Sequence, residues 1–276
     1  LTDKLDGRVF DGLARLADER DLGDTYTFTP AEGEPPLNAR LLSAERQASP
    51  FGPSLAYQVE LTRGEERITA EVRAHLPLKA ARLELELEID NHARDHRLRL
   101  HFPLRGAQSG YTGGHYHTYP RALSAPLAYQ QGWFEQPRPE LPQCLFSGLQ
   151  AAQGGLAAAA PGIYEVELAQ TAEGGNLALT LLRCVGMLSK PDLANRQGGA
   201  GPSLPTPGAQ EIGRHHFRLA LIPHTGGWQE AWPQAETFDL SPRALPGPGA
   251  QGPLPAVASF FTLSGLILTS LKPAED

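Results

Sequence analysis

Residues 83–89 read Leu-Glu-Leu-Glu-Leu-Glu-Ile, and this pattern sets the expected class of fold. Apolar and acidic side chains alternate with a period of two, which puts them on opposite faces of a β-strand. The same period recurs in residues 57–61, 68–72 and 98–102. A turn at residues 63–66 separates the first two of these segments and predicts a hairpin. The chain is therefore predicted to form antiparallel strands, and the acidic face of residues 83–89 is interpreted as a solvated face.

Further segments extend this pattern along the chain. The additional strand candidates are residues 162–168, 177–183, 215–222 and 256–263. Helix has little support, because the best candidate, residues 7–19, is short. Fewer than about a tenth of the residues are expected to be helical, against roughly 30–35% in an average globular protein. The predicted fold is all-β, a large antiparallel sandwich with long loops.

The composition fits that architecture and excludes several kinds of partner. Gly 29 and Pro 25 make 54 of 276 residues, which predicts many turns in a chain that is 41% hydrophobic. Lys plus Arg is 24 and Asp plus Glu is 31, so the net charge of −7 argues against nucleic acid. No run approaches the ~20 apolar residues of a membrane span. Cys144 and Cys184 cannot form a disulfide framework, so a reducing, cytoplasmic compartment is expected.

Several strings, taken together and in their order, resemble one family. They are Asp21–Phe28, Ile89–Arg99, Gly132–Pro137, Leu181–Ser189 and Asp192–Arg196. The first of them, Asp-Leu-Gly-Asp-Thr-Tyr-Thr-Phe, looks like the Asp-x-Gly-Asp passage of that family. The family is glycoside hydrolase family 38, which comprises α-mannosidases and mannosylglycerate-hydrolysing bacterial relatives. The similarity is to its C-terminal β domains.

The resemblance implies a galactose-mutarotase-like supersandwich and a part in glycoside hydrolysis. Members of the family are retaining glycosidases whose nucleophile, acid/base and most or all zinc ligands lie in an N-terminal barrel and helical region. Residues 1–276 are accordingly expected to be a single β-supersandwich domain, a fragment of a longer chain. The catalytic barrel and a last small C-terminal β domain are expected to be missing. The expected role is to shape the active-site wall and to dock on the barrel.

The resemblance also implies a set of partners and cofactors. The expected ligand is an α-mannoside, and the expected protein partner is the enzyme's own N-terminal catalytic domain. No cofactor is expected in the fragment, because zinc belongs to the missing catalytic domain. The isolated fragment is therefore expected to be inactive. No nucleic-acid or membrane partner is expected, and a homo-oligomer is left open.

The segment Tyr111–Arg121 is rich in aromatic residues and predicts contacts with a sugar. Aromatic faces stack on the apolar faces of pyranose rings, while their polar tips bind hydroxyl groups. By resemblance, Tyr111 matches a family tyrosine that reaches the active site. His115 and His117 share one side of an extended segment and are candidates for sugar contact. Two alternatives stay open for this pair: zinc ligands, for which no third ligand is spaced, or a histidine pair of a loop or core.

Three charged residues complete the substrate-binding candidates. Glu135 is a hydrogen-bonding group for a sugar, with a structural role as the alternative. Arg183 and Arg196 flank the turn at residues 186–192, in the region where relatives carry an arginine that approaches the substrate. The five donors of a guanidinium suit paired hydroxyls or the carboxylate of mannosylglycerate. The alternative for both arginines is an interdomain ion pair or an exposed side chain.

These candidates lead to one spatial prediction and to two competing functions. Tyr111, His115, Arg183 and Arg196 are expected along one concave edge that faces the barrel. No residue of the fragment is assigned to catalysis or to a metal. One competing function is a non-catalytic carbohydrate-binding module. The other is a mutarotase-like sugar epimerase, for which His115 or His117 with Glu135 are the only candidates for the acid and base.

Overall fold

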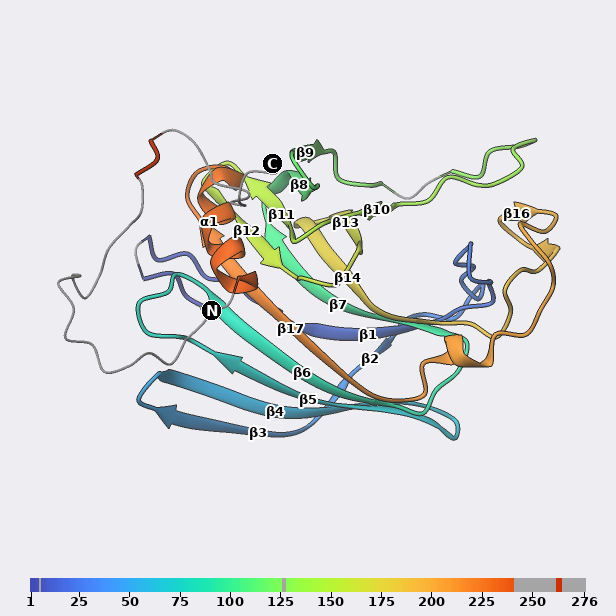
Figure 1. The fold of residues 1–276 in the computed structure, drawn as a ribbon, viewed down its shortest axis with the longest axis horizontal. Helices are drawn as coiled ribbons and strands as arrows, with labels where there is room; N and C mark the ends of the chain where they lie inside the picture. Colours follow the sequence, from blue (N-terminus) through green and yellow to red (C-terminus); the bar gives the residue numbers. More distant parts are fainter. Residues whose placement is uncertain (5, 126–127, 241–261, 265–276) are drawn as a thin grey trace, which may run out of the picture. The chain divides into compact units, whose positions relative to one another are not determined.

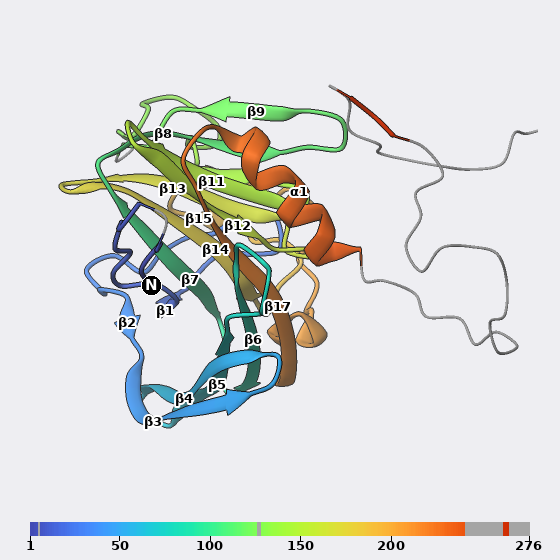
Figure 2. The ribbon, with the colours of Figure 1, turned by 90° about the vertical axis from the view of Figure 1, so that its left-hand side faces the viewer.

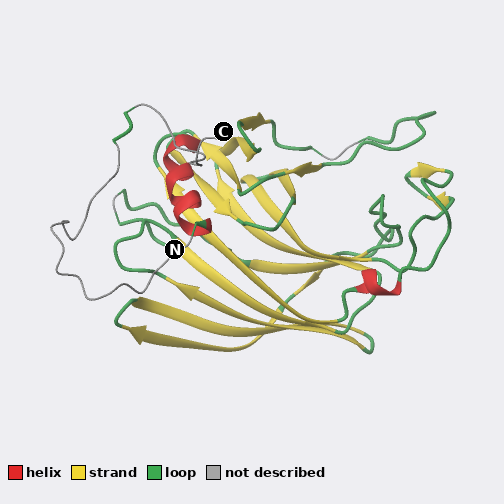
Figure 3. Cartoon of the chain, in the orientation of Figure 1, coloured by secondary structure: helices red, strands yellow, loops and turns green. Residues whose placement is uncertain are grey.

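The computed structural model describes residues 1–4, 6–125, 128–240 and 262–264. Leu1–Ser241 forms one compact unit, and the fold described below is that of this unit. It consists mainly of strands, drawn in yellow in Figure 3. Most of residues 242–276 lie outside the described residues, so the single-domain prediction for the whole chain stays a prediction.

The strands form two large sheets (Figure 1). The six-stranded sheet has the order β10 (Glu140–Pro142), β13 (Glu165–Thr171), β14 (Gly174–Cys184), β7 (His96–Arg105), β1 (Arg15–Arg20) and β2 (Leu37–Asn38). The nine-stranded sheet has the order β3 (Arg40–Ser49), β4 (Gly52–Arg63), β5 (Glu66–His75), β6 (Leu83–Asn91), β17 (Gly213–His224), β12 (Gly154–Ala159), β11 (Phe146–Ala151), β8 (Ala107–Gly113) and β9 (Thr118–Arg121). Neighbouring strands in both sheets run antiparallel, which confirms the predicted all-β antiparallel class.

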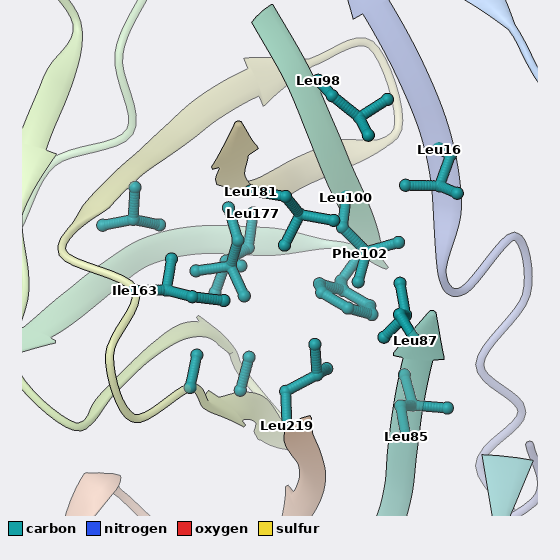
Figure 4. Close-up of a cluster of buried hydrophobic side chains, with 14 of the residues drawn as sticks. Leu16, Leu85, Leu87, Leu98, Leu100, Phe102, Ile163, Leu177, Leu181 and Leu219 are labelled. Atoms are coloured by element: carbon teal, nitrogen blue, oxygen red, sulfur yellow. The ribbon is translucent and has the colours of Figure 1, made fainter. Parts of the chain in front are cut away.

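The hydrophobic core lies between the two sheets (Figure 4). β6 contributes Leu85, Leu87 and Ile89 from the nine-stranded sheet, each at most 1% exposed. β7 contributes Leu100 and Phe102 from the six-stranded sheet, and they are equally buried. The intervening glutamates of β6 face outward. Burial of one such side chain contributes about 1.5–3 kcal/mol, so the period-two pattern of the sequence directly determines which face each strand turns inward.

One α-helix, α1 (Trp228–Asp239), was not expected from the sequence. Figure 2 shows it lying along the nine-stranded sheet, where it contacts β17, β12 and β11. Its buried residues are Ala231, Trp232, Ala235 and Phe238, a spacing typical of a helix face. Pro233 and the preceding Gly226-Gly227 resemble turn signals and obscured this stripe. Together with the short 3-10 turn η1 (Pro207–Gln210), α1 makes up the helix of the described residues, so the low helix content is confirmed.

Three expected segments differ from the structure. The candidate at 162–168 begins only at Glu165 as β13, because Gly162 lies in a turn with φ of +81°. The best helical candidate, 7–19, leads instead into the strand β1. The candidate at 256–263 falls outside the described residues except for Thr262 and Leu263, which are not in a strand. Over the described ranges, no helix has the length and apolar character needed to cross a membrane.

Candidate functional site

Three loops meet beside the small hairpin of β15 (Asp192–Leu193) and β16 (Arg196–Gln197), at the right-hand end of Figure 1. We call residues 21–30, 128–139 and 187–206 the loop cluster. Backbone hydrogen bonds join its loops, from Thr25 to Met187 (3.2 Å), from Gln136 to Asn195 (2.9 Å) and from Gln197 to Phe134 (2.7 Å). The cluster therefore brings together three of the strings through which the chain resembles family 38.

The centre of the loop cluster is a buried ion pair between Asp24 and Arg196. The side chains are 0% and 2% exposed, and Nη2 of Arg196 lies 2.5 Å from Oδ2 of Asp24. The remaining donors of Arg196 reach Oδ1 of Asp24 (3.2 Å), Oγ1 of Thr27 (2.6 Å), and the carbonyls of Lys190 (3.0 Å) and Gly198 (3.3 Å). All five N–H groups of Arg196 thus have partners within the chain. Arg196 holds loops together and has no donor left for a ligand.

Asp24 is surrounded by donors from two loops. It accepts backbone hydrogen bonds from Tyr26 (3.0 Å), Thr27 (3.0 Å) and Lys190 (2.7 Å) in addition to the two from Arg196. Burial disfavours the charged carboxylate, but Arg196 and these N–H groups outweigh it and lower the pKa of Asp24 from 3.8 to about 2. Asp24 is therefore ionised at neutral pH and is not a general acid.

A second ion pair, between Asp21 and Arg183, lies beside the first. Nε of Arg183 is 3.1 Å from Oδ2 of Asp21, and the other guanidinium nitrogens bind the carbonyls of Thr25 (3.2 Å) and Asp24. Burial raises the pKa of Asp21, and Arg183 offsets only part of this effect. Arg183 is 18% exposed and, among the described residues, uses three of its five N–H groups, so two are without a described partner. Both arginines form ion pairs within this unit and neither is fully exposed, while an interdomain contact of Arg183 stays a prediction.

Glu135 joins this network from the third loop. Its carboxylate accepts from Oγ1 of Thr27 (3.3 Å) and pairs with Arg138 (2.9 Å). Because Thr27 also accepts from Arg196, a chain of polar contacts runs from Arg196 through Thr27 to Glu135. The side chain of Glu135 is 40% exposed, so it also reaches solvent. The structure thus brings together Glu135, Arg183 and Arg196, as the sequence predicted for the two arginines.

Tyr111 lies elsewhere, in a buried cluster below α1. Its side chain is 3% exposed, and its hydroxyl lies 2.9 Å from Nε2 of His224. The ring packs near Phe146, with centroids 5.8 Å apart. Burial raises the pKa of Tyr111 well above its ordinary value. Tyr111 was predicted along one concave edge with the two arginines, but its ring fills core space in a separate buried cluster, so the structure does not group it with them; substrate contact by Tyr111 stays a prediction.

His115 and His117 lie in the turn between β8 and β9, where both are exposed. The ring of His117 meets Tyr119 edge-on at 5.1 Å, and the ring of His115 lies 6.2 Å from Tyr116. Among the described residues, the polar contacts of the Glu135 carboxylate are to Thr27 and Arg138 rather than to either histidine, and an epimerase acid/base pair stays a prediction. Across the described ranges, no group of three or more His, Cys, Asp and Glu residues could hold a metal ion.

The loop cluster also exposes aromatic side chains. Tyr26, Trp133 and Phe134 are 46%, 55% and 61% exposed. Arg138 donates to the carbonyl of Tyr26 (2.8 Å), and Gln197 donates to that of Trp133 (3.2 Å). These side chains are therefore presented from a backbone that the neighbouring loops hold in place.

A polar groove adjoins the loop cluster on the outer face of the six-stranded sheet. Its volume is about 610 Å³, and Arg97 and Arg99 of β7 line it. Neither arginine was among the candidates predicted from the sequence, although residues 96–102 read His-Arg-Leu-Arg-Leu-His-Phe with apolar and polar side chains in alternation. The alternation shows that the arginines share the face opposite the core leucines. The alternation cannot predict that loops 21–30 and 128–139 cover that face and turn it into a groove.

No family model matches the chain. The chain is 30% identical over 221 residues to a protein of Halalkalibacterium halodurans described as "Putative mannosylglycerate hydrolase", covering 78% of this chain and 22% of that protein. Two Enterococcus faecalis structures, an α-mannosidase and a glycosyl hydrolase family 38 protein, match with TM-scores of 0.68 and 0.67 at 21% identity. Each match covers 85% of this chain, and 28% and 29% of those chains. The chain thus spans less than a third of the proteins it matches.

Proposed function

We propose that this chain, a relative of the glycoside hydrolase family 38 proteins, is the C-terminal β region of a retaining α-mannosidase-type glycosidase. Its relationship to the family confirms the resemblance drawn from the sequence. In this proposal the chain forms part of the active-site wall and docks on a catalytic barrel that lies outside residues 1–276. The nucleophile, the acid/base and the zinc ion belong to that barrel. The substrate is an α-mannoside.

The observation that carries the proposal is the construction of the loop cluster. Its three loops expose Tyr26, Trp133 and Phe134, and beneath them lies the buried pair of Asp24 and Arg196. Exposed large apolar side chains that gather in one region are typical of surfaces that another body covers. A buried charge pair is costly to desolvate and leaves little freedom in the position of its loops. A fixed set of loops with an apolar surface suits a docking interface and a preorganised wall.

Within this proposal the charged candidates have different roles. Arg196 is a positioning residue, because its five donors are occupied by the chain itself. Arg183 keeps two N–H groups and contacts the substrate or the barrel. Glu135 is half-exposed and accepts hydrogen bonds at the edge of the wall. His115, His117 and Tyr111 are proposed contacts on the β8–β9 hairpin side.

The test is an activity assay with metal analysis. The 276-residue chain and a longer protein that includes a barrel are each incubated with an aryl α-mannoside and Zn²⁺. The short chain is expected to show neither turnover nor stoichiometric zinc, while the long protein shows both. Turnover by the short chain that disappears in Glu135→Gln, or zinc that is lost in His117→Ala, would contradict the proposal.

The docking part is tested in the long protein. The double variant Trp133→Ala/Phe134→Ala removes two exposed aromatic side chains of the loop cluster and is expected to lower kcat/KM or to let the two regions separate in limited proteolysis. The matched control is Tyr164→Ala, because Tyr164 is 70% exposed and lies outside the loop cluster. Equal behaviour of the two variants would show that the loop cluster is not the docking surface.

A further inference from the structure

We infer that the groove on the outer face of the six-stranded sheet binds a neutral carbohydrate of one or two sugar rings. Its volume of ≈ 610 Å³ lies within the range of about 300–1,000 Å³ that small-molecule sites occupy. Residues of β1, β7, β10 and β13 form it together with loops 21–30 and 128–139. The inference takes its ligand class from the proposed function but does not depend on the chain being part of a hydrolase.

Arg97 forms the first part of the groove floor. It is 3% exposed and pairs with Glu19 (2.9 Å) and with Glu140. Its guanidinium carbon lies 3.4 Å from the ring centroid of Phe28, a cation–π contact. Burial disfavours the charged guanidinium, but Glu19 and Glu140 outweigh it and raise the pKa of Arg97. A charged group is therefore held on the outer face of a sheet with its orientation set by three neighbours.

Arg99 forms the second part, two residues along β7. It is 8% exposed and pairs with Glu19 (2.8 Å) and with Glu167. Its Nε has no hydrogen-bond partner among the residues that the structure describes, and neither does Nε2 of His101, the next residue on the same face. Nδ1 of His101 receives a hydrogen bond from Asn176 (2.9 Å), so Nε2 carries the proton of the neutral ring. Arg99, which lines the groove, and His101, which follows it on the same strand face, thus each have a buried donor without an acceptor among the described residues, which is rare in a completed polar network.

The charge balance of the groove selects the ligand class. Three arginines and three glutamates line it, so their net charge is 3 − 3 = 0: Arg97, Arg99, Arg138, Glu19, Glu140 and Glu167. The three carboxylates repel an anionic ligand, and the three guanidinium groups repel a cationic ligand. A neutral ligand avoids both repulsions. Sugar hydroxyls both donate and accept, so one ring can satisfy glutamate and arginine at the same time.

The walls of the groove complement this floor. They combine apolar surfaces with neutral polar groups: Phe28, Pro30, Pro137 and Pro139, and Ser124, Gln136, Gln170 and Asn195. Apolar walls suit the C–H faces of a pyranose ring, and amides and hydroxyls suit its rim. A site with both kinds of wall and a balanced charged floor is typical of recognition of a neutral polyol rather than of a lipid or a phosphate.

The test is an amide NMR titration of the 276-residue chain with methyl α-mannoside and with an α-linked mannobiose. Saturable shifts are expected at β7 and β13, around Arg99 and Glu167. Glu167→Gln keeps the shape of the side chain but removes a charge-assisted acceptor, and is expected to weaken binding about tenfold. The matched control is Glu71→Gln on β5 of the other sheet, where the side chain is 47% exposed, and it is expected to leave binding unchanged.

A second variant keeps the test decisive if Glu167→Gln perturbs the fold. Ala169 lines the groove without joining an ion pair, so Ala169→Leu fills the space and is expected to abolish the shifts. The inference is overturned if no saturable shifts occur, if they centre on Trp133 and Phe134, or if Ala169→Leu binds as the parent does. Loss of mannoside hydrolysis in the longer protein, with sugar binding intact here, would count against the proposed function alone.

Discussion

The loop cluster and the β8–β9 hairpin both contain residues predicted to contact a sugar, but their polar side chains differ in how far they are hydrogen-bonded within the protein. In the loop cluster, all five donors of Arg196 are bound within the chain. In the hairpin, His115 and His117 are exposed, and their rings lie near those of Tyr116 and Tyr119. The difference shows that a residue type suited to a ligand is available only where the fold leaves its donors or acceptors free.

The largest expected effect tests the structural role of Arg196. Arg196→Ala leaves the carboxylate of Asp24 buried without its charged partner, and is expected to lower the free energy of unfolding by about 3–5 kcal/mol. Urea denaturation measures the loss. The control is Arg138→Ala, which removes a half-exposed pair with Glu135 and is expected to cost at most about 1 kcal/mol. Equal losses in the two variants would show that the buried pair does not hold the loops.

The second prediction concerns pH. The pKa of Asp24 falls from 3.8 to about 2 on folding, so the unfolded chain takes up this proton first as the pH falls. The stabilisation by Asp24 is complete above about pH 4 and is lost toward pH 2; at 1.36 kcal/mol per pKa unit it amounts to about 2 kcal/mol. Asp21 acts in the opposite direction, because burial raises its pKa.

The contribution of Asp24 is isolated by comparison with a variant. The free energy of unfolding of the parent and of Asp24→Asn is measured between pH 2 and pH 5 by urea denaturation. The decline toward low pH is expected to be shallower in Asp24→Asn, because that variant has no carboxylate to protonate. Parallel curves for the two proteins would refute the assignment.

A smaller effect is expected at the base of the hairpin. Tyr111→Phe removes the hydroxyl that contacts Nε2 of His224 and leaves that buried nitrogen without a partner, at an expected cost of about 1–2 kcal/mol. Tyr119→Phe is the matched control, since Tyr119 is 47% exposed, and is expected to change stability by less than about 0.5 kcal/mol. Thermal unfolding of both variants makes the comparison; a neutral Tyr111→Phe would mean that the hydrogen bond contributes nothing to the fold.

The smallest effect on stability is expected at the exposed turn. His117→Ala removes an edge contact with Tyr119 and is expected to change stability by less than about 0.5 kcal/mol. If His117 contacts the sugar, the variant of the longer enzyme loses one hydrogen bond to the substrate. Its KM is then expected to rise by the factor that corresponds to about 0.5–1.5 kcal/mol of binding free energy, while its stability is unchanged. A stability loss above about 1 kcal/mol would identify His117 as a structural residue.

How far the sequence predicts the structure differs between sheets and loops. The alternation at residues 83–89 correctly assigned Leu85 and Leu87 to the core, because a strand repeats every two residues whatever its neighbours are. The helix α1 was missed because Pro233 and the adjacent glycines resemble turn signals, while Trp232 finds its partner Phe146 in a distant strand. A local pattern cannot report a contact of that kind.

The candidate site was predicted less completely for the same reason. Glu135, Arg183 and Arg196 were identified, but their carboxylate and hydroxyl partners were not, since Asp24 and Arg196 are separated by 172 residues. Arg97 and Arg99 were missed because the outer face of a strand is ordinarily solvated, and only the loops over it make a groove.

The sequence by itself determined the class of fold, the inward face of the main strands and the relationship to family 38. These follow from short-range periodicity and from strings of residues, both of which are properties of the chain read in order. The tertiary structure alone decided which polar side chains have all their donors and acceptors bound within the protein and which keep some for a ligand. Arg196 is saturated, Arg183 keeps two donors, and Arg99 keeps an unpartnered Nε beside the groove. The physical reason is that hydrogen bonds and ion pairs are satisfied in space, by groups that the chain brings together from distant positions.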